Sequence, residues 1–297
     1  MLSKDELRPG DLLFGQGTGP LSWLIRKFDG SPYSHVGLYL GGDRIAQARE
    51  CGLDDSMDVD NFQGYFDLVD VYRLVKPVSD IHAVLGRAEQ YIDSGGRFAG
   101  EELAMIGILC VLKPAHKELL HAAVRILDRM DAELEVLIDW VTHRQKGYPM
   151  ICSEFAYRSY VEACPGSIKV ELVHHRTIKF NGDVIEKRFA STKPRPDACE
   201  HVKGIVAELG PGIRRNLEAA ATSPEPPQSP REPISFGKPL SQIMETAFFY
   251  SATYQTPPPL LSGGVIELPF PPADFVSPGD LARSPSLNCV GQLAKAT

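Results

Sequence analysis

The segment that decides the fold runs Tyr33-Ser34-His35-Val36-Gly37-Leu38-Tyr39-Leu40-Gly41-Gly42-Asp43. Large apolar side chains occupy alternate positions over 34–40, which predicts a half-buried β-strand with His35 on the face opposite those side chains. The glycine-rich end of the segment predicts a hairpin turn, and residues 44–48 predict the returning strand. The sequence therefore predicts an antiparallel strand pair with a histidine near its start.

The rest of the first 220 residues predicts a mixture of strands and helices. Apolar residues recur at helical spacing between about residues 80 and 145, which predicts an α-helical insertion. Another helix is expected over 154–163, directly after Cys152. Further strands are expected at residues 11–14, 69–75, 168–172 and 177–180. These elements place the chain in the α+β class.

The composition changes after about residue 220. Fourteen of the 24 prolines lie between residues 224 and 285, and proline interrupts both helices and sheets. The same region keeps several aromatic side chains, so it differs from a purely polar linker. We expect a folded domain over 1–220 and a partly ordered, proline-rich C-terminal extension over 221–297.

Charge and composition limit the functions and the cellular locations that we expect for this protein. A net charge of −7 over 297 residues argues against nucleic acid as a partner. The N-terminus shows no apolar leader, and the longest apolar run, Leu103 to Leu112, is too short for a transmembrane segment. We expect a cytoplasmic protein, or one exported by a route that needs no signal peptide.

The six cysteines show no CxxC pair and no zinc-type spacing. We therefore expect free thiols and neither a metal nor another cofactor. The acidic residues between 54 and 60 lack the spacing of a calcium loop, so a solvated loop is the better interpretation.

Cys152 is the candidate nucleophile and His35 the candidate base. The N-terminus of a helix stabilises a thiolate through its unpaired N–H groups, and the same groups can hold the oxyanion of a tetrahedral intermediate. A buried cysteine that serves only as a small apolar side chain is the alternative. The position of Cys152 at a predicted helix start, together with a histidine on a strand, favours the catalytic interpretation.

A third residue is needed to orient the imidazole, and the hairpin turn limits the choice. A three-residue turn at 41–43 places Gln47 on the face of His35, and its amide oxygen can accept from the ring. A two-residue turn shifts the register by one and makes Glu50 the candidate instead. We favour Gln47 because it needs the shorter reach. Tyr33 is a candidate donor to the substrate oxyanion, with packing of its ring as the alternative.

Together these residues resemble the circularly permuted papain-like cysteine hydrolases. The closest likeness is to the YiiX-like branch of the NlpC-type superfamily, which includes the lecithin retinol acyltransferase-like enzymes. The matching pieces are Arg8-Pro9-Gly10-Asp11-Leu12-Leu13-Phe14, Ser34-His35-Val36-Gly37-Leu38-Tyr39-Leu40-Gly41, Ile45-Ala46-Gln47-Ala48 and Cys152-Ser153-Glu154-Phe155. The resemblance covers about residues 8–50 and 147–163 well, and it covers the helical insertion and the C-terminal extension poorly.

The resemblance implies an antiparallel sheet packed against the helix that carries Cys152. It also implies Cys–His hydrolysis or transfer of an acyl group through an acyl-enzyme. In such families the position of Gln47 often holds an acidic residue or a histidine, although papain-like enzymes more generally use an amide there.

Three functions follow as expectations. The first is a cysteine amidohydrolase that cleaves a peptide or peptidoglycan-like amide. The second is a lipid-directed acyl hydrolase or acyltransferase on the same Cys–His pair, with residues 101–141 and the C-terminal extension as a peripheral membrane surface. The third is a non-catalytic binding module, whose partner could be a protein that recognises prolines such as those at 257–259.

Overall fold

The structure is a computed structural model, and it describes residues 1–49, 52–96, 150–163, 168, 170–172, 176–181, 265–270 and 276–295. The chain divides into two compact units. The first comprises Met1–Ala99, Lys146–His174 and Phe275–Thr297, and the second comprises Gly100–Gln145 and His175–Asp274.

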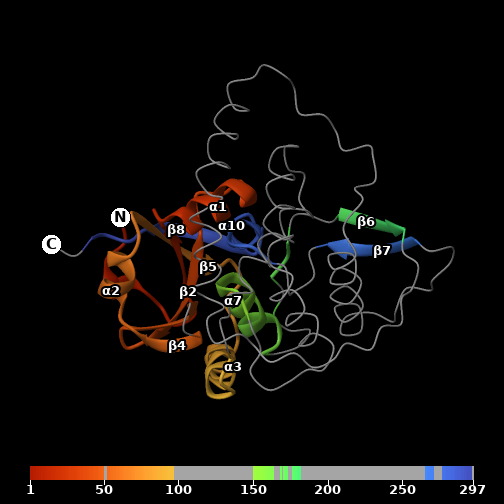
Figure 1. Cartoon of the computed structure of the whole chain (residues 1–297). Coiled ribbons are helices and arrows are strands. Elements are labelled where there is room, and N and C mark those ends of the chain that lie inside the picture. The colour runs from red at the N-terminus through yellow and green to blue at the C-terminus, as the bar shows by residue number, and fades with distance from the viewer. Residues whose placement is uncertain are drawn as a thin grey trace. The chain divides into compact units, whose positions relative to one another are not determined.

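A six-stranded antiparallel sheet forms the centre of the first unit (Figure 1). Its strands lie in the order β4-β3-β2-β1-β5-β8. Their bounds are Leu12–Gln16 for β1, His35–Gly41 for β2, Arg44–Arg49 for β3, Gly52–Met57 for β4, Leu68–Leu74 for β5 and Leu287–Gln292 for β8. The outermost strand beside β5 therefore comes from the C-terminal part of the chain.

Short helices surround this sheet, and their starts follow ordinary capping chemistry. Asp58, Asp80 and Ser277 each accept a backbone N–H at the start of their helix. Gly30 ends the first helix in the left-handed conformation that glycine adopts easily. The bounds are Pro20–Asp29 for α1, Val59–Gly64 for α2, Ile81–Asp93 for α3, Cys152–Val161 for α7 and Pro278–Ala282 for α10, with a 3₁₀ turn at Lys4–Glu6.

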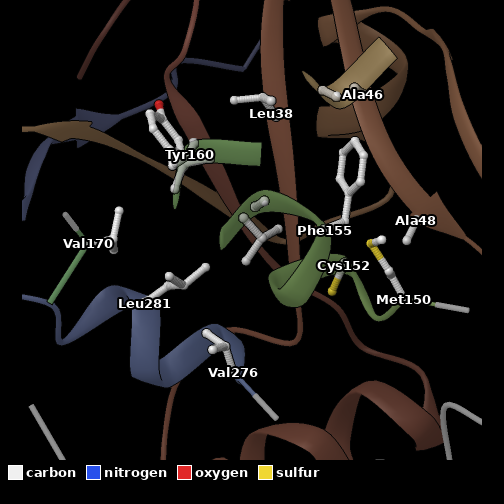
Figure 2. Close-up of a cluster of buried hydrophobic side chains, with 14 of the residues drawn as sticks. Leu38, Ala46, Ala48, Met150, Cys152, Phe155, Tyr160, Val170, Val276 and Leu281 are labelled. Carbon is white, nitrogen blue, oxygen red and sulfur yellow. The ribbon is translucent and has the colours of Figure 1, made fainter. Parts of the chain in front are cut away.

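The two faces of the sheet carry separate hydrophobic clusters. On one face, Leu38 and Ala46 pack with Phe155 of α7 and with α3 residues (Figure 2). On the other face, Ile45 packs with Phe62 of α2. Alternating side chains along each strand supply both clusters, as the pleat of a strand requires. The helix that carries Cys152 thus packs on one face and α2 on the other.

The turn between β2 and β3 holds two residues, Gly42 and Asp43, both with positive φ. The expected three-residue turn is therefore wrong. A register shift between Tyr39 and Gly41 offsets the shorter turn, so that Leu38 pairs with Ala46. This irregularity restores the register that places position 47 on the face of His35.

Most expected elements are present, and the α+β class is confirmed. The sequence did not predict the strands β4 and β8. The interpretation of residues 54–60 as a solvated loop is wrong. Two of those acidic residues lie in the edge strand β4, where they form ion pairs with arginines of β3. Of the described residues of 168–172, Ile168, Val170 and Leu172 are buried and Glu171 is exposed, and none of them lies in a strand. Most of the expected helical insertion lies outside the described residues, and α3 belongs to the first unit.

In the second unit the structure describes one antiparallel pair, β6 (Arg176–Asn181) with β7 (Val265–Phe270). The strand expected at 177–180 is thus present, and its partner comes from the proline-rich extension. Within the described residues of the whole chain, no helix is both long and apolar enough to span a membrane.

Candidate active site

Cys152 is the first residue of α7 and is almost completely buried, with 2% of its surface exposed. Ile151 occupies the N-cap position and its side chain has no acceptor for the first N–H groups of the helix. The backbone N–H groups of Cys152 and Ser153 lie close to the sulfur and act to lower the pKa of the thiol. The sequence places the cysteine where a helix N-terminus can stabilise a developing thiolate.

Burial dominates the ionisation of this thiol in the structure. Loss of solvation raises the pKa of Cys152 to about 11, although the surrounding backbone N–H groups act to lower it. In the form of the protein that the structure describes, the Cys152 thiol is therefore neutral at pH 7. The expected helix effect is present, but in this form it is smaller than the effect of burial.

His35 and Gln47 are in direct contact. The amide oxygen Oε1 of Gln47 lies 2.9 Å from Nε2 of His35. Gln47 is itself buried, and its amide nitrogen donates to the sulfur of Met57 at 3.1 Å. That second hydrogen bond fixes the orientation of the amide, so that its oxygen faces the ring.

This contact defines the tautomer of His35. An amide oxygen only accepts, so Nε2 of the imidazole must carry the hydrogen. In the neutral ring Nδ1 is then the basic nitrogen. Phe66 stacks on the imidazole with ring centroids 5.5 Å apart and an interplanar angle of 19°, and Phe62 lies against it at 5.9 Å. These contacts hold the ring in one plane.

The thiol and the imidazole belong to opposite faces of the sheet, and both lie near the start of β2. Cys152 belongs to the cluster under α7, whereas His35 packs against aromatic residues 62 and 66 on the α2 side. The link is Val36, whose backbone N–H lies near the thiol and acts to lower its pKa. The sulfur therefore lies beside the residue that directly follows His35.

Tyr33 has a different environment from the one expected for an oxyanion donor. Its hydroxyl donates to Asp70 at 2.7 Å and lies 3.2 Å from the hydroxyl of Tyr72. Burial and these neighbours raise its pKa well above the ordinary value. Its ring packs against Phe14 with centroids 5.2 Å apart. The Tyr33 hydroxyl is therefore hydrogen-bonded to a residue of β5. These contacts favour the alternative in which the ring serves packing.

Glu50, the alternative third residue, lies outside the described residues. Asp11, which belongs to the matching piece at 8–14, accepts the backbone N–H of Arg8 at 2.8 Å and forms two hydrogen bonds with the Arg73 guanidinium. No group of three or more potential metal ligands occurs among the described residues.

Comparison with known proteins gives one partial similarity. The chain is 40% identical over 52 residues to the probable lipoprotein peptidase YaeF of Escherichia coli (strain K12). The aligned segment covers 18% of this chain and 19% of that protein, so the chain spans about a fifth of the curated relative it matches. No family model matches, and no solved structure matches. Over that segment the chain is similar to a protein described as a peptidase, which fits the resemblance to papain-like cysteine hydrolases.

Proposed function

We propose that the protein is a cysteine hydrolase that cleaves an amide bond in a peptide or peptidoglycan-like substrate through an acyl-enzyme on Cys152. The observation that carries this proposal is the proximity of the Cys152 thiol to the backbone N–H of Val36, the residue next to His35. It brings a cysteine at a helix N-terminus to the strand end where Gln47 orients the ring of His35. The partial similarity to a probable lipoprotein peptidase supports a peptide or lipoprotein as substrate.

The proposed reaction uses these groups as follows. Nδ1 of His35 takes the proton of the thiol as the sulfur attacks the carbonyl carbon. The N–H groups at the start of α7 stabilise the oxyanion. His35 then gives the proton to the leaving amine as the C–N bond breaks. Water attacks the thioester with His35 again as base, and a carboxylic acid and the free thiol are released. Gln47 accepts from Nε2 throughout and is a positioning residue.

A panel of acyl substrates tests the proposal. The full chain is incubated with N-acyl amino-acid anilides, short peptides and acyl nitrophenyl esters, and acylated enzyme is located by peptide mass. We expect an acyl adduct on Cys152 and turnover that is lost in Cys152→Ala. We expect His35→Ala to lower turnover by about a hundredfold to ten-thousandfold, the usual contribution of a general base.

The chain offers a matched control in Cys289, the exposed free cysteine of β8. Cys289→Ala should turn over substrate like the wild type. Undiminished hydrolysis by Cys152→Ala would overturn the proposal. Turnover of esters with no turnover of amides would favour an acyl hydrolase, and absence of any adduct on Cys152 would favour a binding module.

A further inference from the structure

The residues that precede β8 form a strap against the candidate site. We define the C-terminal strap as residues 276–284, which include α10; this helix packs against both α1 and α7 (Figure 1). Val276 and Leu281 are fully buried in the same hydrophobic cluster as Cys152 (Figure 2). A segment distant in sequence is thus part of the packing around the candidate nucleophile.

Asp29, at the end of α1, holds this strap in place. Its carboxylate accepts from the Ser277 hydroxyl at 2.6 Å and from the backbone N–H of Gly279, and it forms an ion pair with Arg283 at 3.4 Å. The side chain of Asp29 is only 3% exposed. A buried carboxylate is stable only with such partners, so the strap and Asp29 stabilise each other.

The contact at Gly279 leaves no space for a side chain. A Cβ there would lie 2.6 Å from a carboxylate oxygen of Asp29 and 2.7 Å from the Cβ of Ser31. The approach of the strap to α1 therefore depends on a glycine at this position, and adding one methyl group would force the two apart.

The strap also reaches the residue next to the nucleophile. The hydroxyl of Ser153 donates to the backbone carbonyl of Val276 at 2.6 Å. The same hydroxyl lies within hydrogen-bonding reach of the Cys152 sulfur, where donation favours the thiolate. A hydroxyl carries one proton, so while Ser153 donates to Val276 it does not donate to the sulfur.

We propose that the C-terminal strap is an autoinhibitory contact. Latched by Asp29, it engages the Ser153 hydroxyl and keeps Cys152 buried and unreactive. Its displacement exposes the thiol and releases the Ser153 proton to hydrogen-bond the thiolate. Ser153 is then a positioning residue that stabilises the thiolate from the next position of α7. This inference rests on the proposed function in so far as Cys152 is the nucleophile, but its test measures thiol reactivity and needs no substrate.

Alkylation of Cys152 by limiting iodoacetamide, measured on the full chain by peptide mass, tests the strap. Gly279→Ala drives Asp29 and the strap apart, and Gly86→Ala in α3 is the matched control, because a Cβ there meets open space. Breaking a hydrogen-bonded contact changes an equilibrium by about tenfold, so we expect at least about tenfold faster alkylation of Cys152 at pH 7.5 in Gly279→Ala. We expect no change in Gly86→Ala.

Cys289 serves as the internal reference in every sample, because it is already exposed. Its rate should stay constant while that of Cys152 rises. Equal acceleration of both cysteines would mean general loosening of the fold and would overturn the proposal. If Gly279→Ala does not fold, Ser277→Ala removes the hydrogen bond to Asp29 together with the N-cap of α10, and it should increase the alkylation rate in the same direction.

Ser153 variants in the Gly279→Ala background test the role of the hydroxyl. Adding Ser153→Ala should move the midpoint of Cys152 alkylation to higher pH, whereas Ser153→Thr, which keeps a hydroxyl, should retain the lower midpoint. Unchanged midpoints in both would overturn the assignment of Ser153. Faster alkylation in strap variants that turn over no acyl substrate would refute the hydrolase while supporting the strap, so the two proposals fail independently.

Discussion

The amide oxygen of Gln47 accepts a hydrogen bond from Nε2 of His35, and the amide nitrogen is held by the sulfur of Met57. The ring is therefore fixed in the tautomer whose Nδ1 is basic. In Gln47→Ala this tautomer loses one neutral hydrogen bond, so we expect turnover to fall by about tenfold. Because Gln47 is buried, the same variant should also lower the melting temperature, so turnover is compared well below the melting temperature of both proteins.

The charged variant Gln47→Glu tests the same contact in another way. A carboxylate beside Nε2 stabilises the imidazolium and should raise the pKa of His35. The acidic limb of the pH–rate profile should therefore move to higher pH than in the wild type. A profile with an unmoved acidic limb would show that residue 47 does not act through the ring.

Gly37 lies on the same face of β2 as His35 and has no room for a side chain. A Cβ there would lie 2.6 Å from a methyl group of Ile45 and 2.9 Å from the ring of Phe62, which itself contacts His35. We expect Gly37→Ala to reduce the free energy of unfolding by about 1–3 kcal/mol through overpacking. Gly64→Ala is the control, because nothing lies near its Cβ position. Chemical denaturation measures both, and equal stability would contradict the close packing.

Arg73 forms two hydrogen bonds with the carboxylate of Asp11, which is 1% exposed. Removing the arginine leaves a buried charge without its main partner. We expect Arg73→Ala to lower the free energy of unfolding by about 3 kcal/mol. Adding Asp11→Asn should recover part of this loss, because the neutral amide is less costly to bury. Urea denaturation of the two variants and the double variant measures the coupling; additive losses would show that the pair does not interact.

Burial of the Cys152 thiol links its protonation to stability. The pKa of this group is about 11 in the folded protein, compared with 9.0 for an unperturbed cysteine. Because the folded state retains the proton more strongly, this contribution is fully present below pH 9 and is lost as the pH rises through 11. It amounts to about 2–3 kcal/mol.

We therefore expect the free energy of unfolding to fall between pH 9 and 11 by less in Cys152→Ala than in the wild type. Cys289→Ala, which removes a far less buried thiol, should stay closer to the wild-type curve. Parallel curves for Cys152→Ala and the wild type over this range would show that the thiol is already solvated in the free protein.

Local patterns were sufficient to predict the elements on both sides of the candidate site. Alternating apolar residues identified β2, and the pattern after Cys152 identified α7. The register of the hairpin was harder, because a two-residue turn and a strand irregularity offset each other. Turn length alone would have selected Glu50, and only the tertiary structure shows that the offset keeps Gln47 beside His35.

The strands that were not expected lack the pattern that predicts a strand. In β4 two aspartates lie on the sheet edge and pair with arginines, which is how natural edge strands avoid further pairing. In β8 Leu287 is buried, but the five residues after it are not. The burial of Cys152 and the engagement of Ser153 also depend on the C-terminal strap, which is distant in sequence. No local signal in residues 150–155 could have indicated it.

The position of β8 also has a consequence for the order of synthesis. On the ribosome β5 emerges long before β8, so the backbone groups along its outer edge lack their final partners while the second unit is being made. An open strand edge is a site for pairing with other chains. When β8 arrives, its last residue and the segment after it also bond the N-terminal segment, with Leu2 donating to Gln292 and accepting from Ala294. The C-terminal segment therefore pairs with the open edge of the sheet and brings the strap to Asp29 in the same late step. The thiol becomes buried only when the sheet is completed.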